Sequence, residues 1–434
     1  MKSDTNLLED MCELIADCPH STPKWTDSGI LVIRNQNIKN GRLDLSKPSY
    51  TDEENYQYRI KRAEPKENDI VFTREAPMGE LCLIPKNLKV CLGQRQVLLR
   101  PKLGVNAKYL YYALQSSYVR HQISWNEGTG TTVSNIRIPF LKQFLIPRNK
   151  NSEDEIANIL STLDDKIELN RKMNQTLEEM AQVLFTSWFV DFDPVHAKAG
   201  CESDEELEVV AKELGISKEV LELFPSEFVE SEMGMIPLGW EVKPLDQIAH
   251  YQNGLALQKF RPKDENNFLP VLKIAQLKKG YADGEEKADP NIKPECIVDD
   301  GDVVFSWSGS LVVDVWCGGK VALNQHLFKV TSNEYAKWFY YHWTKQHLLN
   351  FQRVAAAKAV TMGHIKRSHL AEALCVVPDD TVFNMTETML NPLLEKLILN
   401  RLEINNLQKT RDILLPKLLS GELDVSKITT NKEN

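Results

Sequence analysis

The chain has 434 residues, of which 42% are hydrophobic and 26% charged, the proportions of a globular protein with apolar cores. This composition excludes a disordered or collagen-like chain, and no run of about 18 apolar residues predicts a membrane span. The net charge of −9 is uneven: residues 1–150 hold 22 Lys and Arg against 16 Asp and Glu, and residues 151–235 hold 6 against 21. A polyanion could therefore contact the basic block while the acidic block stays in solvent or contacts a protein.

The first 150 residues predict a mixed α/β globule. Short strands are expected at Asp69–Thr73 and Gln96–Arg100, between Gly and Pro residues, with a helix at Ala107–Ser117. The N-terminus lacks the apolar run of a secretory signal, and the eight cysteines are scattered without a CxxC pair. We therefore expect buried, reduced thiols and a cytoplasmic location.

A long helix follows, with Ser152 as its N-cap and acidic residues in its first turn. Its apolar stripe repeats every three or four residues: Ile156, Leu160, Leu163, Ile167, Leu177, Met180 and Leu184. At about 1.5 Å per residue, the helix would be a rod of about 50 Å. An acidic segment, 191–235, then predicts an ordered linker that carries a short amphipathic helix at Glu205–Leu214.

The second half repeats the plan of the first at an offset near 230 residues. Residues 68–73 (NDIVFT) match 301–306 (GDVVFS), 91–95 (CLGQR) match 322–326 (ALNQH), and 132–136 (TVSNI) match 361–365 (TMGHI). The repeat predicts a second globule, with a strand at Asp302–Ser306 and a helix at Glu334–Leu349. The Trp240 entry to this half has no clear counterpart around Met11–Trp25.

The second long helix carries a matching stripe, and we expect Pro416 to end it. The stripe comprises Leu390, Leu393, Leu397, Ile404, Leu407 and Leu414. The two stripes predict an antiparallel pair. Asn170, Asn174 and Asn400 interrupt them, and these amides either set the register of the pair or face water.

No convincing catalytic motif is present. There is no phosphate-binding loop and no Asn/Asp-Pro-Pro-aromatic tetrapeptide for a flipped base. His342/His347 and His364/His369 are five residues apart, a poor spacing for metal on one helix face. Asp302 suggests a catalytic acid, but its repeat partner Asp69 indicates a structural turn into a strand.

Basic and amide side chains instead favour recognition of a nucleic acid, because such groups pair with base edges and phosphates. The candidates in the first half are Arg34, Gln36, Lys39, Arg59, Lys61, Arg62, Arg74, Gln94, Arg95, Thr131, Asn135 and Arg137. Those in the second half are Gln252, Asn253, Lys273, Lys278, Gln325, His326, Lys358, Thr361, His364, Lys366 and Arg367. An adaptor that binds only protein, or an enzyme, remains an alternative.

Three motifs resemble the specificity subunit of type I restriction-modification systems. They are residues 158–170 (NILSTLDDKIELN) continuing to 185–192 (FTSWFVDF), the junction 233–240 (MGMIPLGW), and the ending 411–423 (RDILLPKLLSGEL). The resemblance spans essentially the whole chain. It implies a mixed α/β fold with two target-recognition domains of approximate two-fold pseudo-symmetry, separated by a long antiparallel helix pair.

The resemblance also implies a division of the chain and a function. The expected segments are recognition domain 1 (1–150), a central helix (151–190), an acidic linker (191–235), recognition domain 2 (236–380), a C-terminal helix (381–424) and a flexible tail (425–434). Each domain would read one half of a bipartite site in double-stranded DNA. The chain itself would hold no cofactor and perform no catalysis.

Partner subunits would supply the chemistry. Two methyltransferase subunits, with S-adenosylmethionine, would methylate adenine, and a restriction subunit would translocate and cut DNA with ATP and Mg²⁺. The expected interface of the helix pair and the partners comprises Leu160, Leu163, Ile167, Asn170, Leu177, Phe185, Trp188, Leu393, Leu397, Asn400, Leu407 and Leu414.

Overall fold

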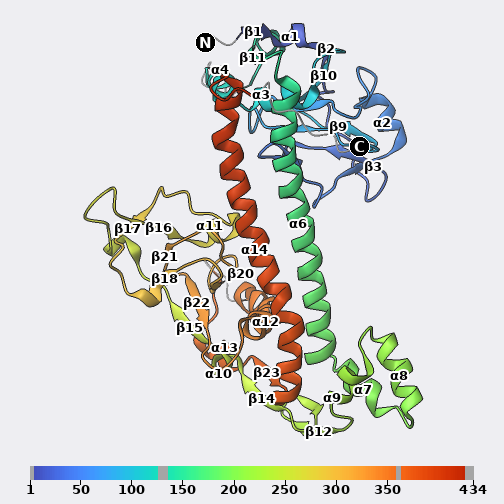
Figure 1. The fold of residues 1–434 in the computed structure, drawn as a ribbon, viewed down its shortest axis with the longest axis vertical. Coiled ribbons are helices and arrows are strands. Elements are labelled where there is room, and N and C mark those ends of the chain that lie inside the picture. Colours follow the sequence, from blue (N-terminus) through green and yellow to red (C-terminus); the bar gives the residue numbers. More distant parts are fainter. Residues whose placement is uncertain (1–3, 126–134, 358–362, 426–434) are drawn as a thin grey trace. The chain divides into compact units, whose positions relative to one another are not determined.

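The computed structural model describes residues 4–125, 135–357 and 363–425, and the chain forms two units (Figure 1). Unit 1 comprises residues 1–166 and 407–434, and unit 2 comprises residues 167–406. These units differ from the expected segments because each takes part of both long helices. No helix among the described residues is both long and apolar enough to cross a membrane.

Unit 1 contains a four-stranded antiparallel sheet and a smaller sheet with a parallel pair. The first has the order β2 (Cys12–Asp17), β10 (Gln96–Pro101), β7 (Ile70–Thr73), β8 (Leu81–Leu83). The second has the order β6 (Tyr50–Thr51), β3 (Ile30–Ile33), β9 (Val90–Leu92), with β3 and β9 parallel. The other elements are β1 (Asp4–Leu7) paired with β11 (Leu145–Arg148), β4 (Ile38–Lys39) paired with β5 (Arg42–Leu43), and the helices α1 (Leu8–Met11), η1 (Asn35–Asn37), α2 (Glu53–Arg59), α3 (Ala107–Leu114), α4 (Ser117–Ser124) and α5 (Ile138–Lys142).

Unit 2 has the same plan. Its antiparallel sheet has the order β15 (His250–Asn253), β22 (Leu327–Thr331), β19 (Val303–Ser306), β20 (Val313–Val315). Its mixed sheet has the order β17 (Lys287–Ala288), β16 (Leu269–Leu272), β21 (Val321–Leu323), β18 (Ile297–Val298), with β16 and β21 parallel. The other elements are β14 (Glu241–Pro244) paired with β23 (Leu374–Val377), and the helices α10 (Leu245–Ile248), η2 (Leu257–Lys259), α11 (Ile274–Lys279), η3 (Pro294–Cys296), α12 (Lys337–Ala357) and α13 (Arg367–Ala371).

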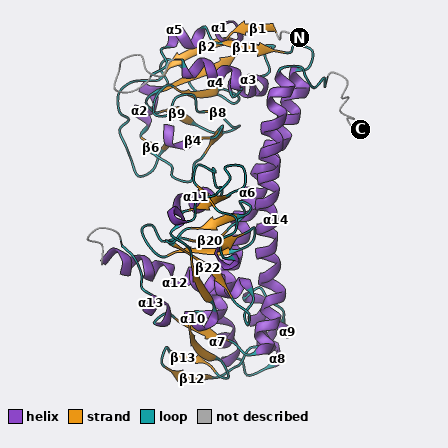
Figure 2. Ribbon diagram, turned by 90° about the vertical axis from the view of Figure 1, so that its left-hand side faces the viewer, coloured by secondary structure: helices purple, strands orange, loops and turns teal. Residues whose placement is uncertain are grey.

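The predicted repeat and the mixed α/β class are confirmed, and the strands of both units are orange in Figure 2. The start of unit 1 was the part of the repeat that the sequence analysis missed. β1 and α1 occupy the place that β14 and α10 take in unit 2, because each pairs a first strand with the last strand of its globule. The expected helix Ala107–Ser117 is α3, which ends at Leu114, and a separate helix, α4, begins at Ser117 with Ser116 as its N-cap.

The matched turns before β7 and β19 are structural, as predicted. Asn68 and Gly301 both have a positive φ, of 66° and 87°, and each precedes an aspartate. Asp69 Oδ2 accepts from the Lys66 amide at 2.8 Å, and Asp302 Oδ2 accepts from the Asp299 amide at 2.7 Å. Each carboxylate also forms an ion pair with a cation of the neighbouring strand, Arg100 in unit 1 and Lys329 in unit 2. These aspartates therefore close a turn and bind an adjacent strand.

The two long helices are α6 (Glu153–Phe189) and α14 (Asp380–Leu419), and each continues from one unit into the other (Figure 1). In unit 1, Arg411 donates to Asp164 at 2.7 Å. The expectation that Pro416 ends the second helix is wrong, because α14 runs three residues further. Leu418 and Leu419 are buried in the core of unit 1, and this packing offsets the hydrogen bond that proline cannot donate.

In unit 2 the two helices pair antiparallel, and two of the three asparagines, Asn170 and Asn400, are buried, whereas Asn174 is partly exposed. Asn170 and Asn400 are 0% and 1% exposed. Asn170 Nδ2 donates to Glu403 at 2.7 Å, and Asn400 Nδ2 donates to Asn174 at 2.9 Å. These directional bonds join fixed positions of the two helices, so they favour one register.

Several residues expected at the helix pair belong to the cores of the units. Phe185 and Trp188 lie in the core of unit 2, where the Phe185 ring packs edge-on against Trp343 of α12 at 5.2 Å. Leu393 packs against the same core, and Leu397 is 3% exposed. In unit 1, Leu160 is buried in the core, and Leu414 is partly buried and packs against that core. The remaining interface candidates are Leu163, Leu177 and Leu407, all partly exposed, and Ile167, which is buried.

The acidic segment is helical and joins the core of unit 2. It forms α7 (Asp193–Ala199), α8 (Asp204–Glu213) and α9 (Lys218–Leu223), then the hairpin β12 (Phe228–Ser231)–β13 (Gly234–Pro237). Ser203 and Ser217 cap α8 and α9 through their hydroxyls. Val195 and Phe224 are buried against the end of α6. The segment is therefore a packed part of the fold, whereas the expected tail beyond Val425 lies outside the described residues.

All eight cysteines are free, and seven of them are buried. Burial raises the pKa of the Cys91 and Cys317 thiols to about 11, which keeps these thiols protonated at neutral pH. The expectation of buried, reduced thiols therefore agrees with the structure.

Candidate nucleic-acid interface

Polar side chains of unit 1 gather where β3, β9 and β7 end. β3 and β9 are parallel, so their carboxyl ends meet at one edge of the sheet. Arg34 follows β3, and Gln94 and Arg95 follow β9. We call the group Trp25, Arg34, Gln36, Glu75, Gln94, Arg95 and Asn135 the unit 1 edge.

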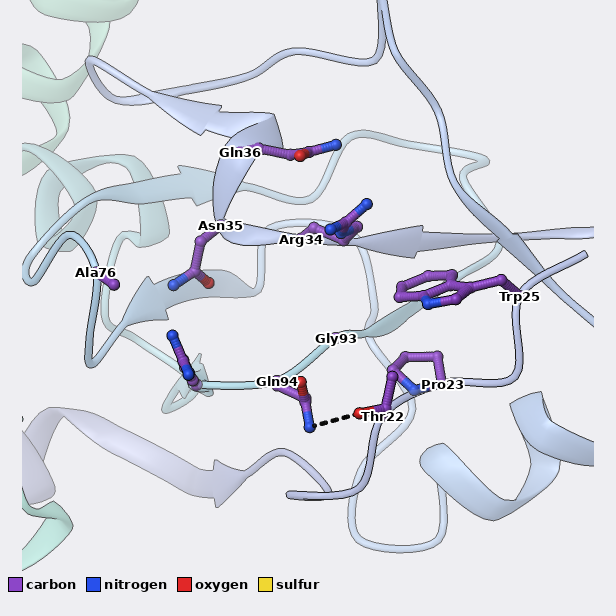
Figure 3. Close-up of a pocket in the computed structure, with 10 residues that line it drawn as sticks. Thr22, Pro23, Trp25, Arg34, Asn35, Gln36, Ala76, Gly93 and Gln94 are labelled. Carbon is purple, nitrogen blue, oxygen red and sulfur yellow. Dashed lines mark hydrogen bonds between the residues drawn. The ribbon is translucent and has the colours of Figure 1, made fainter.

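Five residues of the unit 1 edge, all but Glu75 and Asn135, line an open cavity of about 310 Å³ (Figure 3). The Arg34 guanidinium lies over the Trp25 ring, 4.9 Å from its centroid, and Trp25 is 44% exposed. Gln94 also lines the cavity. Its Nε2 donates to the His20 carbonyl at 2.5 Å, and this bond fixes the Gln94 side chain. The lining residues are Thr22, Pro23, Trp25, Arg34, Asn35, Gln36, Ala76, Gly93, Gln94 and Arg95. An exposed aromatic ring beside guanidinium and amide groups suits stacking and hydrogen bonding to bases.

Glu75 links three segments at this edge. Its Oε2 lies 3.3 Å from Nε of Arg95, and its Oε1 accepts from Asn135 Nδ2 at 2.6 Å. Its backbone carbonyl accepts from Asn35 Nδ2 at 2.5 Å. The carboxylate therefore fixes an exposed arginine against the segment that precedes α5.

Unit 2 builds the corresponding edge with different side chains. β16 and β21 are parallel, so Lys273, which follows β16, and Gln325 and His326, which follow β21, meet at one edge. His326 Nδ1 lies 2.9 Å from Ser308 Oγ. Its ring lies 5.9 Å from that of Trp307, which in turn contacts His364 edge-on at 6.4 Å. We call the group Lys273, Trp307, Ser308, Gln325, His326 and His364 the unit 2 edge.

The two edges correspond residue by residue. The register of the parallel pairs and the following turns matches Arg34 with Lys273, Gln94 with Gln325, Arg95 with His326, and Asn135 with His364. The Arg74 amide donates to the Arg95 carbonyl, and the Trp307 amide donates to the His326 carbonyl, so the turns have the same backbone contact. The same backbone arrangement thus presents one set of polar side chains in unit 1 and another set in unit 2.

Two predicted DNA-binding arginines have a structural role instead. Arg59 is 3% exposed, and its guanidinium donates to the carbonyls of Pro19, Ser21, Leu92 and Gly93. Burial lowers the pKa of Arg59. Arg74 is 8% exposed, donates to the Ile136 carbonyl and forms an ion pair with Asp17 at 2.9 Å. Their hydrogen-bonding groups are used within unit 1.

The remaining described candidates lie outside the two edges. Those that are exposed are Lys39, Lys61, Arg62, Arg137, Asn253, Lys278, Lys366 and Arg367. Lys61 lies over the Tyr58 ring, and Arg367 donates to the Tyr251 carbonyl and lies over Phe328. Gln252 is partly buried and donates to the Asn253 carbonyl. Thr131, Lys358 and Thr361 lie outside the described residues.

Sequence reasoning missed Trp25, Glu75, Trp307 and Ser308. An exposed Trp25 in a polar segment was a signal, but only the pairing of β3 with β9 places it beside Gln94. Glu75 was overlooked because the search favoured cations and amides. In the described part of the chain, no cluster of three His, Cys, Asp or Glu residues could hold a metal ion.

Comparisons with known proteins agree with this architecture. A sequence profile described as "Type I restriction modification DNA specificity domain" matches residues 4–179 and 237–374. The chain is 28% identical over 368 residues to the type I restriction enzyme MjaIX specificity subunit of Methanocaldococcus jannaschii, covering 83% of this chain and 78% of that protein. It is 27% identical over 311 residues to the HindI specificity subunit of Haemophilus influenzae, covering 63% and 68%.

A solved structure shares the fold. The crystal structure of the type I restriction-modification S subunit from M. genitalium matches with a TM-score of 0.54 and 16% identity, over 95% of each chain. The profile covers more than half of the chain and matches it twice, once in each half. This protein therefore belongs to the family of type I restriction-modification specificity subunits, which recognise DNA sequence.

Proposed function

We propose that this chain recognises a bipartite site in double-stranded DNA, with unit 1 reading one half and unit 2 the other. The observation that carries the proposal is the pair of matched edges, built on the same backbone frame with different polar side chains. Guanidinium, amide and imidazole groups can each hydrogen-bond to base edges in the major groove. Two frames with different side chains suit two different half-sites.

The long helices would set the unread spacer between the half-sites. α6 has 37 residues, about 55 Å at 1.5 Å per residue, and α14 has 40. Rods of this length exceed one turn of B-DNA, about 34 Å. The buried asparagine bonds of unit 2 would keep the helix register, and therefore the spacer, constant.

Catalysis would belong to partner subunits. Two methyltransferase subunits would bind S-adenosylmethionine and methylate adenine, and a restriction subunit would use ATP and Mg²⁺ to translocate and cut DNA. Exposed apolar residues on the outer faces of the helices support a protein partner there. They are Leu169, Met180 and Val183 on α6 and Leu399 and Ile413 on α14.

The test is to co-express this chain with its methyltransferase in a host without adenine methylation and to map methylated adenines. We expect one split motif with a fixed spacer. An assembled complex that leaves DNA unmethylated and shows no salt-dependent affinity for DNA would favour the adaptor, because binding through phosphate contacts weakens steeply with salt. An assembled complex that methylates a continuous motif would contradict the bipartite reading.

A further inference from the structure

We infer that Arg95 is the residue through which unit 1 requires a guanine in its half-site. The inference rests on the proposed function and names one specificity-determining contact within it. Four observations support it: the constrained backbone of Arg95, the contact of its guanidinium with Glu75, the different contacts of the neighbouring arginines, and the histidine at the matched position in unit 2.

Arg95 occupies a constrained position at the turn between β9 and β10. Its φ of 66° lies in the left-handed region, which a non-glycine residue adopts only where surrounding contacts impose it. The Arg95 carbonyl accepts from the Arg74 amide at 2.8 Å, and the side chain of Arg74 is itself bound to Asp17. This network fixes the direction in which the Arg95 side chain leaves the turn.

Glu75 orients the guanidinium by holding one of its three nitrogens. The carboxylate lies 3.3 Å from Nε of Arg95 and is itself bound by Asn135. Neither Nη1 nor Nη2 of Arg95 donates a hydrogen bond to any residue of the described ranges, and the side chain is 53% exposed. Two parallel N–H donors therefore remain available, and this fork matches O6 and N7 of guanine in the major groove.

The other arginines near the edge are used differently. The guanidinium of Arg34 stacks on Trp25 and lies 3.4 Å from Ser49 Oγ, which suits contact with a base face or a phosphate. The guanidinium groups of Arg59 and Arg74 are buried, and all three nitrogens of each donate to acceptors inside unit 1. Arg95 is thus the arginine of this edge with an oriented and open fork.

The matched residue in unit 2 has no such fork. His326 takes the place of Arg95, and its Nδ1 is engaged by Ser308. Gln325 Nε2 lies 3.3 Å from His326 Nε2, so the two side chains contact each other. The guanine contact made from this position should therefore be confined to the half-site that unit 1 reads.

The experiment uses the full chain assembled with its methyltransferase. Methylation mapping is performed with the wild type, Arg95→Gln, Arg95→Lys and a control, Arg120→Gln, which removes an exposed charge from α4 outside the edge. We expect Arg95→Gln to relax a guanine at one position of one half-site and to leave the other half-site unchanged. Arg95→Lys should also relax it, because lysine keeps the charge but not the fork. Arg120→Gln should keep the wild-type motif.

A modified base tests the same contact without relying on the variant alone. A cognate duplex with 7-deazaguanine at that position lacks the N7 acceptor. Wild-type binding should fall by about 2- to 12-fold, half the free energy of one bidentate pair, because O6 still accepts from the arginine, whereas binding by Arg95→Gln should not fall further. Three outcomes would overturn the inference. They are a unit 1 half-site without any guanine, an Arg95→Gln motif identical to the wild type, and an equal loss of binding to the 7-deazaguanine duplex in both proteins. Absence of a split motif in the wild type would instead contradict the proposed function.

Discussion

The edges of unit 1 and unit 2 share a backbone and differ in chemistry. Both follow a parallel strand pair, β3–β9 or β16–β21, and both continue into a turn held by one backbone hydrogen bond. Both edges contain a tryptophan and share a glutamine at one matched position, Gln94 and Gln325, but Arg34, Arg95 and Asn135 of unit 1 are replaced by Lys273, His326 and His364 in unit 2. The comparison teaches that the fold conserves positions within the repeat while the side chains at those positions vary.

The matched turns before β7 and β19 offer the largest expected difference in stability. Asp69 is almost fully buried with Arg100, whereas the side chain of Asp302 is 25% exposed beside Lys329. We expect Asp69→Ala to lower the free energy of unfolding by about 3–5 kcal/mol, because Arg100 is left without its partner. Asp302→Ala should cost about 1–2 kcal/mol, because the Asp302 carboxylate is partly exposed and Lys329 keeps its hydrogen bond to the Ile297 carbonyl. Calorimetric melting of the full chain measures both, and equal losses would contradict the difference in burial.

Acid should destabilise unit 2 through His342, which is buried on α12. Burial lowers the pKa of His342 from 6.5 to about 3, so the folded state holds the neutral ring. Below pH 6.5 the imidazole of His342 is protonated in the unfolded chain but stays neutral in the folded chain. The free energy of unfolding therefore falls as the pH falls. The loss at pH 5 should be about 2 kcal/mol.

His342→Phe should remove that part of the pH dependence and keep the stacking on Phe185, whose ring lies 5.2 Å from His342. The measurement is the melting temperature at pH 7.5 and pH 5. The control is His121→Gln, which removes an exposed imidazole from unit 1. Burial also lowers the pKa of His347, so a smaller slope should remain. An unchanged slope in His342→Phe would show that His342 is not the group that titrates.

The smallest expected effect is a change in the spacer between the half-sites when the long helices are lengthened. One additional turn, about 5 Å, is inserted into α6 after Lys166 and into α14 after Asn406, where the two units meet along the chain. We expect both half-sites to be retained and the spacer to change by one or two base pairs, at about 3.4 Å each. Methylation mapping reads this out, and an unchanged spacer would contradict a spacer set by the helices.

Much of the fold was predictable because its signals are local or repeated. The strand at β7 came from a run of β-branched and aromatic residues, and α6 from its N-terminal acids and its stripe. The helix end at Pro416 was mispredicted. The hydrogen bond that proline cannot donate is visible in the local sequence, whereas the burial of Leu418 and Leu419 depends on packing against residues far away in the chain. The first strand of unit 1 was missed because its pairing with β11 joins residues about 140 positions apart.

The sequence by itself determined the repeat, the two long helices and the family, since these depend on periodicity and on contiguous motifs. Only the tertiary structure decided which cations are available to a ligand. Arg59 and Arg95 are equally basic in the sequence, yet Arg59 is buried and donates to four carbonyls 33 to 40 positions away. The Arg95 guanidinium contacts the Glu75 carboxylate through Nε, and within the described residues its two terminal nitrogens donate to no other group. A guanidinium binds whichever acceptors the folded chain places around it, and that placement is set by strand pairing across the unit.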